Sequence, residues 1–178
     1  MAPFSGRWSD ADPHLTPDGC RLFFISNRPD SGDARKESCD LWMVERAGQG
    51  WSAPRPLGRD VCTDATEWSP SVAANGNHYF GTTREGGKGR DDIWMSRLDG
   101  GRYTTPVNLG DSINTRFGEV EPWIAPDESY LIFSAGFRDP PDRRMSVEEL
   151  TRRLRSPGNG LGDIYSIPIE ALELPPRR

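Results

Sequence analysis

Long hydrophobic runs are absent from this 178-residue sequence. The longest apolar stretches, such as residues 21–25 and 130–133, have the size of a strand and fall far short of the roughly 20 residues of a membrane-spanning helix. The residues that follow Met1 also lack the apolar segment of a secretory leader. We therefore expect no membrane span. We also expect a cytoplasmic protein as the chain stands, or a periplasmic one if a leader has been removed.

Cysteine and histidine are scarce. The three cysteines, Cys20, Cys39 and Cys62, form no Cys-x-x-Cys motif, and an odd number cannot all form disulfides with one another. We therefore expect free thiols, which favour a reducing compartment. His14 and His78 have no partner at metal-ligand spacing, and no stretch has the dense acidic spacing of a calcium loop. The sequence therefore predicts neither a metal site nor a cofactor.

A basic excess is missing as well. There are 22 Lys and Arg against 27 Asp and Glu, which gives a formal net charge of -5 and argues against a nucleic-acid partner. Hydrophobic residues make up 34% of the chain, enough for a lean core in one domain. With 19 glycines and 16 prolines, the chain must turn often.

An internal repeat is the strongest signal in the sequence. A shift of 52 residues carries Asp-Leu-Trp-Met at 40–43 onto Asp-Ile-Trp-Met at 92–95, and Trp-Ser-Ala-Pro at 51–54 onto Tyr-Thr-Thr-Pro at 103–106. A third Asp-Ile-Tyr begins at Asp163. Three copies therefore begin near residues 10, 67 and 119, and such self-similarity is typical of repeat architectures.

Each copy contains short apolar stretches separated by turn signals. In the first copy Pro-Asp-Gly at 17–19 predicts a turn, and an aromatic strand follows at 22–26 with counterparts at 78–82 and 131–134. Adding the Asp-Leu-Trp-Met and Trp-x-x-Pro segments gives four short strands in about 50 residues, which is typical of one β-propeller blade. The sequence therefore predicts an all-β fold: one domain over residues 1–178 with three four-stranded antiparallel blades at about 9–58, 66–110 and 118–170.

The turn after the opening strand differs between the copies. Asn75-Gly76 replaces Pro-Asp-Gly in the second copy and turns equally well. Glu128 takes the place of the turn glycine in the third copy, so we expect a turn there that needs no positive φ.

The motifs resemble a known repeat family. The order Pro-x-x-x-Pro-Asp-Gly, Leu-Phe-Phe-x-Ser-x-Arg, a glycine-rich segment before Asp-Ile-Trp, and Trp-x-x-Pro-x-x-Leu-Gly is similar to the WD40-like propeller repeats of the TolB type. The resemblance covers roughly residues 9–170 outside an insertion in the third copy. It implies a propeller that binds proteins or peptides, or gates access to another domain, and rarely performs chemistry itself.

Three blades do not close a ring, because propellers typically close with four to eight. We expect one of three solutions: two chains that form a six-bladed ring as a homodimer, which we favour, a longer chain that supplies the missing blades, or an incomplete arc. The third copy lacks the Trp-x-x-Pro strand, which a partner or the N-terminal segment could supply. We expect the two open faces to carry these side chains: Phe23, Phe24, Trp42, Phe80, Trp94, Ile132 and Tyr165.

Charged residues recur at one edge of each predicted blade. The start of the first strand, the end of the second and the start of the third meet at one edge of an antiparallel sheet, so each copy can form an acid, arginine, acid cluster. Such clusters could simply staple each blade, which is the simpler interpretation, or they could line a channel mouth that binds a peptide terminus or charged side chain. The candidate binding residues are Asp10, Arg28, Asp40, Glu67, Arg84, Asp92, Glu119, Arg138 and Asp163.

The third copy carries an insertion at about 139–160. Ser-Val-Glu-Glu from Ser146 is a capping box and predicts a helix of about ten residues. It could be a cover packed on the blades through Val147, Leu150 and Leu154, which is the simpler interpretation, or a docking site for an acidic partner. The docking residues would be Arg152 and Arg153.

The predicted function is a non-enzymatic scaffold for a protein or peptide partner. The alternative is the propeller part of a carbohydrate-active enzyme or a peptidase, in which acids such as Glu67 and Glu119 line the channel. A purely structural or assembly role is a third interpretation.

Overall fold

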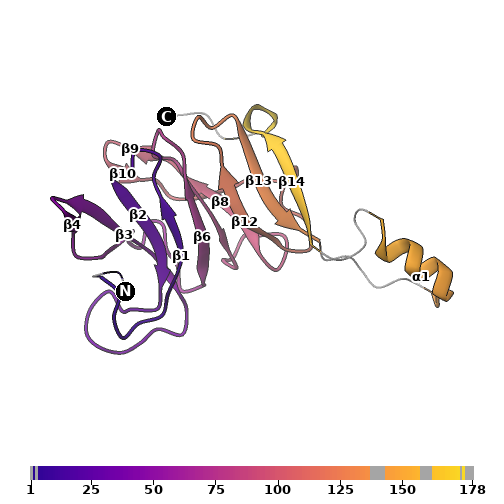
Figure 1. The fold of residues 1–178 in the computed structure, drawn as a ribbon, viewed down its shortest axis with the longest axis horizontal. Helices are drawn as coiled ribbons and strands as arrows, with labels where there is room; N and C mark the ends of the chain where they lie inside the picture. The colour runs from indigo at the N-terminus through magenta and orange to yellow at the C-terminus, as the bar shows by residue number, and fades with distance from the viewer. Residues whose placement is uncertain (1, 3, 137–142, 157–161, 173, 175–178) are drawn as a thin grey trace.

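The structure is a computed structural model that describes residues 2, 4–136, 143–156, 162–172 and 174. The described residues are mostly β, with three antiparallel sheets, a two-stranded ribbon and one α-helix, which confirms the predicted all-β class (Figure 1). The first sheet contains β1 (Asp10–Leu15), β2 (Arg21–Ser26), β3 (Asp40–Ala47), β4 (Gly50–Trp51) and β5 (Arg55–Pro56). The second contains β6 (Glu67–Val72), β7 (His78–Thr82), β8 (Asp92–Ser96) and β11 (Val107–Asn108), beside a ribbon of β9 (Leu98–Asp99) and β10 (Arg102–Tyr103). The third contains β12 (Glu119–Ile124), β13 (Tyr130–Ala135) and β14 (Asp163–Pro168).

The sheets repeat the same core of three strands. β1, β6 and β12 each pair with the next strand of their sheet, and that strand pairs in turn with β3, β8 or β14. The expectation of four strands in every sheet is wrong for two of them, since the first sheet has five strands and the third has three. The third sheet is short because the sequence after Asp163–Pro168 has no Trp-x-x-Pro segment and continues into a 3-10 turn, η1 (Ile169–Ala171).

The first strand of every sheet contains the same bulge. Its pairing shifts register at a residue with positive φ, which is 51° at Asp12, 47° at Ser69 and 55° at Glu121. A proline follows each of these residues and donates no ladder hydrogen bond, so the strand bends at the same place three times.

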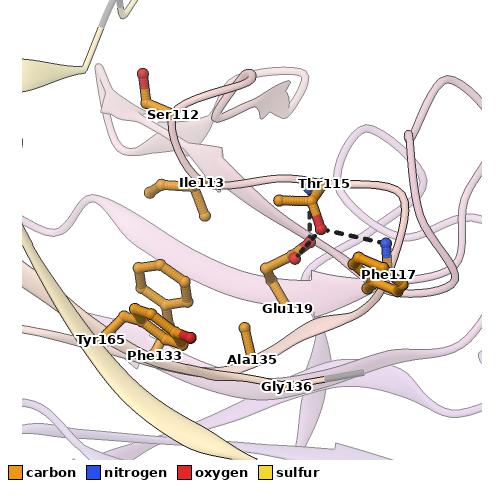
Figure 2. Close-up of a pocket in the computed structure, with 9 residues that line it drawn as sticks. All are labelled: Ser112, Ile113, Thr115, Phe117, Glu119, Phe133, Ala135, Gly136 and Tyr165. Atoms are coloured by element: carbon orange, nitrogen blue, oxygen red, sulfur yellow. Dashed lines mark hydrogen bonds between the residues drawn. The ribbon is translucent and has the colours of Figure 1, made fainter. Parts of the chain in front are cut away.

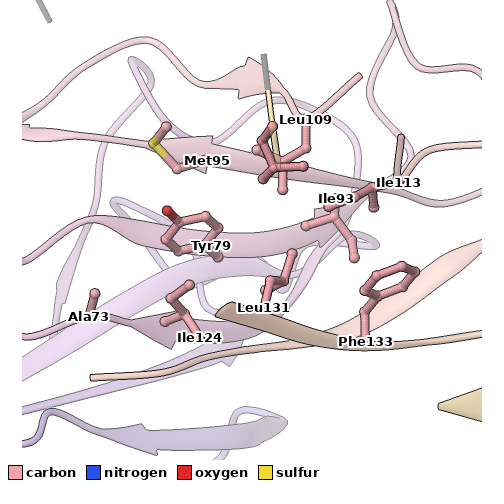
Figure 3. Close-up of a cluster of buried hydrophobic side chains, with 10 residues drawn as sticks. Ala73, Tyr79, Ile93, Met95, Leu109, Ile113, Ile124, Leu131 and Phe133 are labelled. Atoms are coloured by element: carbon pink, nitrogen blue, oxygen red, sulfur yellow. The ribbon is translucent and has the colours of Figure 1, made fainter. Parts of the chain in front are cut away.

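The three sheets pack face to face in sequence order, as Figure 1 shows along the row from β3 to β14. Between the first and second sheets lie Phe23, Leu41 and Phe80, all 0% exposed. Between the second and third lies a larger apolar cluster that includes Tyr79 and Leu131 (Figure 3). The middle sheet is therefore buried on both faces.

Two equivalent hydrogen bonds join the first strands. The backbone N–H of Val72 in β6 donates to His14 Nε2 in β1 at 3.0 Å. The backbone N–H of Ile124 in β12 donates to Ser71 Oγ in β6 at 2.9 Å. Each bond links one sheet to the next at the same position of the repeat, so these strands fix the spacing of the stack.

The two outer faces of the stack differ. On the first sheet, Phe4 stacks on Phe24 with ring centroids 5.4 Å apart and meets Trp51 edge-on. The N-terminal segment therefore covers the first sheet and does not supply a strand to the third. The third sheet leaves Trp123 and Ile164 exposed on its outer face.

The expected list of exposed apolar residues is therefore mostly wrong. Phe23, Phe24, Trp42 and Phe80 are buried, because a neighbouring sheet or the N-terminal segment covers them. Tyr165 is 41% exposed.

The turn at Glu128 also differs from expectation. Its φ is 60°, in the region that usually needs glycine. The Glu128 carboxylate accepts hydrogen bonds from Asn77 Nδ2 and the Tyr79 hydroxyl, each at 2.7 Å, so its contacts with the second sheet offset the backbone strain.

The predicted helix is confirmed as α1 (Val147–Leu154), with Ser146 as its N-cap and a capping box to Glu149. It lies apart from the sheets in Figure 1. Its apolar residues are exposed, with Val147 at 76% and Leu150 at 46%, so the interpretation as a packed cover is wrong. No helix among the described residues is long and apolar enough to cross a membrane.

Stability should depend on pH through His78. Its ring is fully buried against Phe23, Phe80 and Tyr103, and burial lowers its pKa to about 3. The unfolded chain therefore binds a proton near pH 6.5 that the folded chain does not, so this contribution is complete above that pH and is lost as the pH falls. The loss is about 2 kcal/mol of the unfolding free energy between pH 6.5 and 5.

Urea unfolding of the wild type and His78→Phe at pH 7 and pH 5 checks this expectation. The variant should lose less stability on acidification, because the buried imidazole is gone. Parallel losses in the two proteins would contradict the assignment.

Candidate functional site

The strand register places the acids of each predicted edge cluster at the same edge of their sheet. Asp10 lies opposite Ser26, and Ser26 lies opposite Asp40. The same positions are Glu67, Thr82 and Asp92 in the second sheet, and Glu119, Ala135 and Asp163 in the third. The sequence alignment therefore predicted correctly that the two acids of each copy lie at one edge of its sheet.

In the first sheet the arginine pairs with one acid only. Arg28 Nη2 donates to Asp10 Oδ1 at 2.6 Å, and both side chains are almost buried. The guanidinium carbon lies 5.2 Å from the ring centroids of both Phe24 and Trp42, within cation–π range. The second acid, Asp40, pairs with Lys36 instead, so the three-membered cluster does not form.

The second sheet repeats this arrangement at a deeper position. Arg84 Nη2 lies 3.1 Å from Glu67 Oε1 and donates to the Val61 carbonyl at 2.6 Å. The guanidinium carbon lies 5.1 Å from the Phe80 ring centroid and 5.2 Å from that of Trp94. Burial raises the pKa of Glu67 and lowers that of Arg84, while the pair's mutual attraction opposes both shifts.

Glu67 is held by further donors. The backbone N–H and the hydroxyl of Thr63 donate to Glu67 Oε1 at 3.2 and 2.9 Å, and Thr82 Oγ1 lies 3.4 Å from the same oxygen. The side chain of Glu67 is 0% exposed. The Glu67 carboxylate is therefore enclosed by Thr63, Thr82 and Arg84.

Asp92 does not join the pair of Arg84 and Glu67. Its carboxylate accepts the backbone N–H groups of Lys88 and Gly89 at 2.6 and 2.9 Å, and the Asn108 amide at 2.9 Å. It therefore fixes the loop before β8. Its predicted place in an acid, arginine, acid cluster is wrong because loop amides satisfy it.

The third sheet keeps the acid in the same setting. Glu119 is 1% exposed and accepts the backbone N–H and hydroxyl of Thr115 at 2.9 and 2.6 Å. Arg138 lies outside the described residues. Asp163 begins β14 at the expected edge.

A pocket of about 270 Å³ lies beside Glu119 (Figure 2). One wall is the segment 112–117 and the other is the third sheet, with Phe133 and Tyr165 stacked at a centroid distance of 5.7 Å. The pocket thus combines an apolar, aromatic wall with a buried carboxylate.

The sequence prediction missed the threonine beside Glu67 and Glu119 and the aromatic pair under the arginine or pocket of each sheet. A signal for the threonine was present, since the 52-residue shift carries Thr63 onto Thr115. The aromatic pairs could not be recognised from the pattern alone, because alternating side chains show which residues share a face but not which groups contact them.

Other candidate groups are placed as follows. Arg152 is exposed on α1, and Arg153 lies beside the Met145 sulfur at 4.0 Å, so a docking role for the helix stays a prediction. Cys62 is buried, which raises its thiol pKa to about 12. Within the described part of the chain, no group of three or more His, Cys, Asp or Glu side chains could hold a metal ion.

Comparisons with known proteins do not show which family the chain belongs to. No family model and no curated protein matches the sequence. Among solved structures, the chain is similar to the crystal structure of TolB from Acinetobacter baumannii, with 12% identity and a TM-score of 0.45. The match covers 70% of this chain and 26% of that chain, so this chain spans only a small part of that protein's length.

Removing the second arginine should destabilise the protein strongly. Arg84→Met leaves the buried Glu67 without its cation, and breaking a buried pair in this way costs about 3–5 kcal/mol of unfolding free energy. The matched control is Arg55→Met, which removes an exposed pair with Glu45 and should cost under about 1 kcal/mol.

Chemical denaturation of both variants and of Glu67→Gln/Arg84→Met measures these costs. The double variant should recover part of the loss, because no unpaired charge stays buried. Equal small losses for Arg84→Met and Arg55→Met would show that the buried pair does not hold the sheets.

Proposed function

We propose that this protein is a non-enzymatic scaffold of propeller type that binds a protein or peptide partner on its third sheet. The observation that carries the proposal is the exposed outer face of that sheet. Ile164 is 79% exposed, Trp123 44% and Tyr130 39%, and the rings of Trp123 and Tyr130 lie 6.0 Å apart.

The repeat itself supports an occupant for this face. The residue after the opening aspartate of the third strand is Leu41 in the first sheet, Ile93 in the second and Ile164 in the third. Leu41 and Ile93 are 0% exposed because the next sheet covers them. Fully burying one such side chain contributes about 1.5–3 kcal/mol, so a partner that covers this face gains substantial free energy.

Assembly into a ring of two chains stays a prediction and meets an obstacle. In such a ring the third sheet of one chain would pack on the first sheet of the other. Phe4 covers that face by stacking on Phe24, so it would have to leave before a second copy could bind there. This contact favours a different protein or a peptide as the partner.

The enzyme interpretation has less support. Glu67 is enclosed by Thr63, Thr82 and Arg84, and Glu119 is hydrogen-bonded to Thr115. Within the part of the chain that the structure describes, neither acid is paired with a second carboxylate in an open cleft, as hydrolysis of a glycosidic bond would need.

Selection of peptides from a random displayed library on the full chain tests the proposal. Selected peptides should bind saturably, and Ile164→Asp should weaken those that use the outer face at least tenfold. Val147→Asp is the matched control, because Val147 is similarly exposed at 76% but lies on α1.

Two outcomes would contradict the proposal. One is the failure of any peptide to bind. The other is hydrolysis of a glycan or peptide substrate that Glu119→Gln abolishes, which would support the enzyme interpretation.

A further inference from the structure

The pocket of the third sheet occupies the place that the Arg84 guanidinium fills in the second sheet. In both places a turn after a short strand lies against the aromatic face of the next sheet. Val61 and Ile113 make the same turn, each donating its backbone N–H to a glycine carbonyl at 3.1 Å. The 52-residue shift relates these two residues directly.

The groups around the two places match one to one. Each place has a buried glutamate, a threonine that donates to it twice, a residue of the turn, a phenylalanine from the second strand and an aromatic residue opposite it on the third strand. The pairs are Glu67 and Glu119, Thr63 and Thr115, Val61 and Ile113, Phe80 and Phe133, and Trp94 and Tyr165.

Arg84 shows how this set of groups binds a guanidinium. It uses one nitrogen to reach both the carboxylate of Glu67 and the carbonyl of Val61, while its planar head lies near two aromatic rings. Arg28 has the same ring contacts and the same acid position in the first sheet. The arrangement is therefore a guanidinium site that the chain fills twice with its own side chains.

The sequence of the third copy departs from the other two at this point. In the first two sheets Ser26 and Thr82 lie opposite the aspartate that begins the third strand. The arginines, Arg28 and Arg84, come two residues later in the sequence. In the third sheet that position is Ala135, and the residue two positions further along the sequence is a phenylalanine, which lies with Arg138 outside the described residues. Among the described residues, no lysine or arginine lies within ion-pair distance of Glu119, although its side chain is as buried as that of Glu67.

We propose that this pocket binds the arginine side chain of a peptide partner. The inference rests on the proposed scaffold function and adds a second contact for the partner, on the opposite face of the third sheet from Ile164. Glu119 supplies the charge, and the rings of Phe133 and Tyr165 supply a flat surface that suits a guanidinium better than an ammonium. The volume of about 270 Å³ is below that of pockets for drug-sized ligands and fits a single side chain.

Titration of the full chain with acetyl-Gly-Arg-Gly-amide, followed by calorimetry, tests the proposal. Saturable binding is expected. The matched peptide with citrulline keeps the shape of arginine without its charge, and it should bind at least tenfold more weakly.

Three variants assign the binding to the pocket. Glu119→Gln should weaken the arginine peptide at least tenfold, whereas Glu121→Gln, an exposed acid on the same strand, should leave it unchanged. Tyr165→Leu provides a second route if Glu119→Gln folds poorly, because Tyr165 is 41% exposed and its loss should weaken binding without disturbing the core.

The proposal is overturned by equal affinity for the arginine and citrulline peptides, or by arginine binding that survives both Glu119→Gln and Tyr165→Leu. Binding that occurs only in Arg138→Ala would also overturn it, because the pocket would then belong to the chain's own arginine. Library peptides that lack arginine and depend only on Ile164 would reject this pocket while leaving the scaffold function in place.

Discussion

The structure depends on one constraint: each sheet carries apolar side chains on both of its faces, so each needs a neighbour on either side. In β2, Phe23 points toward the second sheet and Phe24 away from it, and both are buried. In β7, Tyr79 and Phe80 are divided in the same way. A sheet of this kind is not stable alone, since the apolar side chains of both faces would meet water. The order of the stack follows from this need.

The polar groups obey the same constraint. An arginine packed over the aromatic side chains of a sheet is shielded from water, so it needs a carboxylate or a carbonyl as a hydrogen-bond partner there. Arg84 finds both, and Arg28 finds its acid. In the third sheet the same setting surrounds Glu119, and among the described residues it forms a pocket lined by this carboxylate. Burial of the acid and affinity for a cation are therefore two results of the same packing.

Much of this architecture was predictable from the sequence. The 52-residue period, the strands and the helix cap depend on local patterns, and the structure places them as expected. The covering of Phe24 by Phe4 was not predictable, because no pattern relates residues that are distant in the chain and meet once. For the same reason the partners of Asp92 and the positive φ of Glu128 could not be predicted. Both depend on contacts with residues elsewhere in the chain. For the pocket, the sequence contained the acid and the aromatic residues, but only the register showed that Phe133 and Tyr165 lie opposite each other as Phe80 and Trp94 do.

The third sheet has an open face where the first two sheets are covered, and amide hydrogen exchange of the isolated chain tests this most directly. The strands to compare are β2, β7 and β13, each of which is hydrogen-bonded to a neighbour on both sides. Amides of β2 and β7 should exchange slowly and those of β13 orders of magnitude faster, because the outer face of its sheet is uncovered. Equal protection of all three strands would show that the outer face is already covered in solution and would contradict an open third sheet.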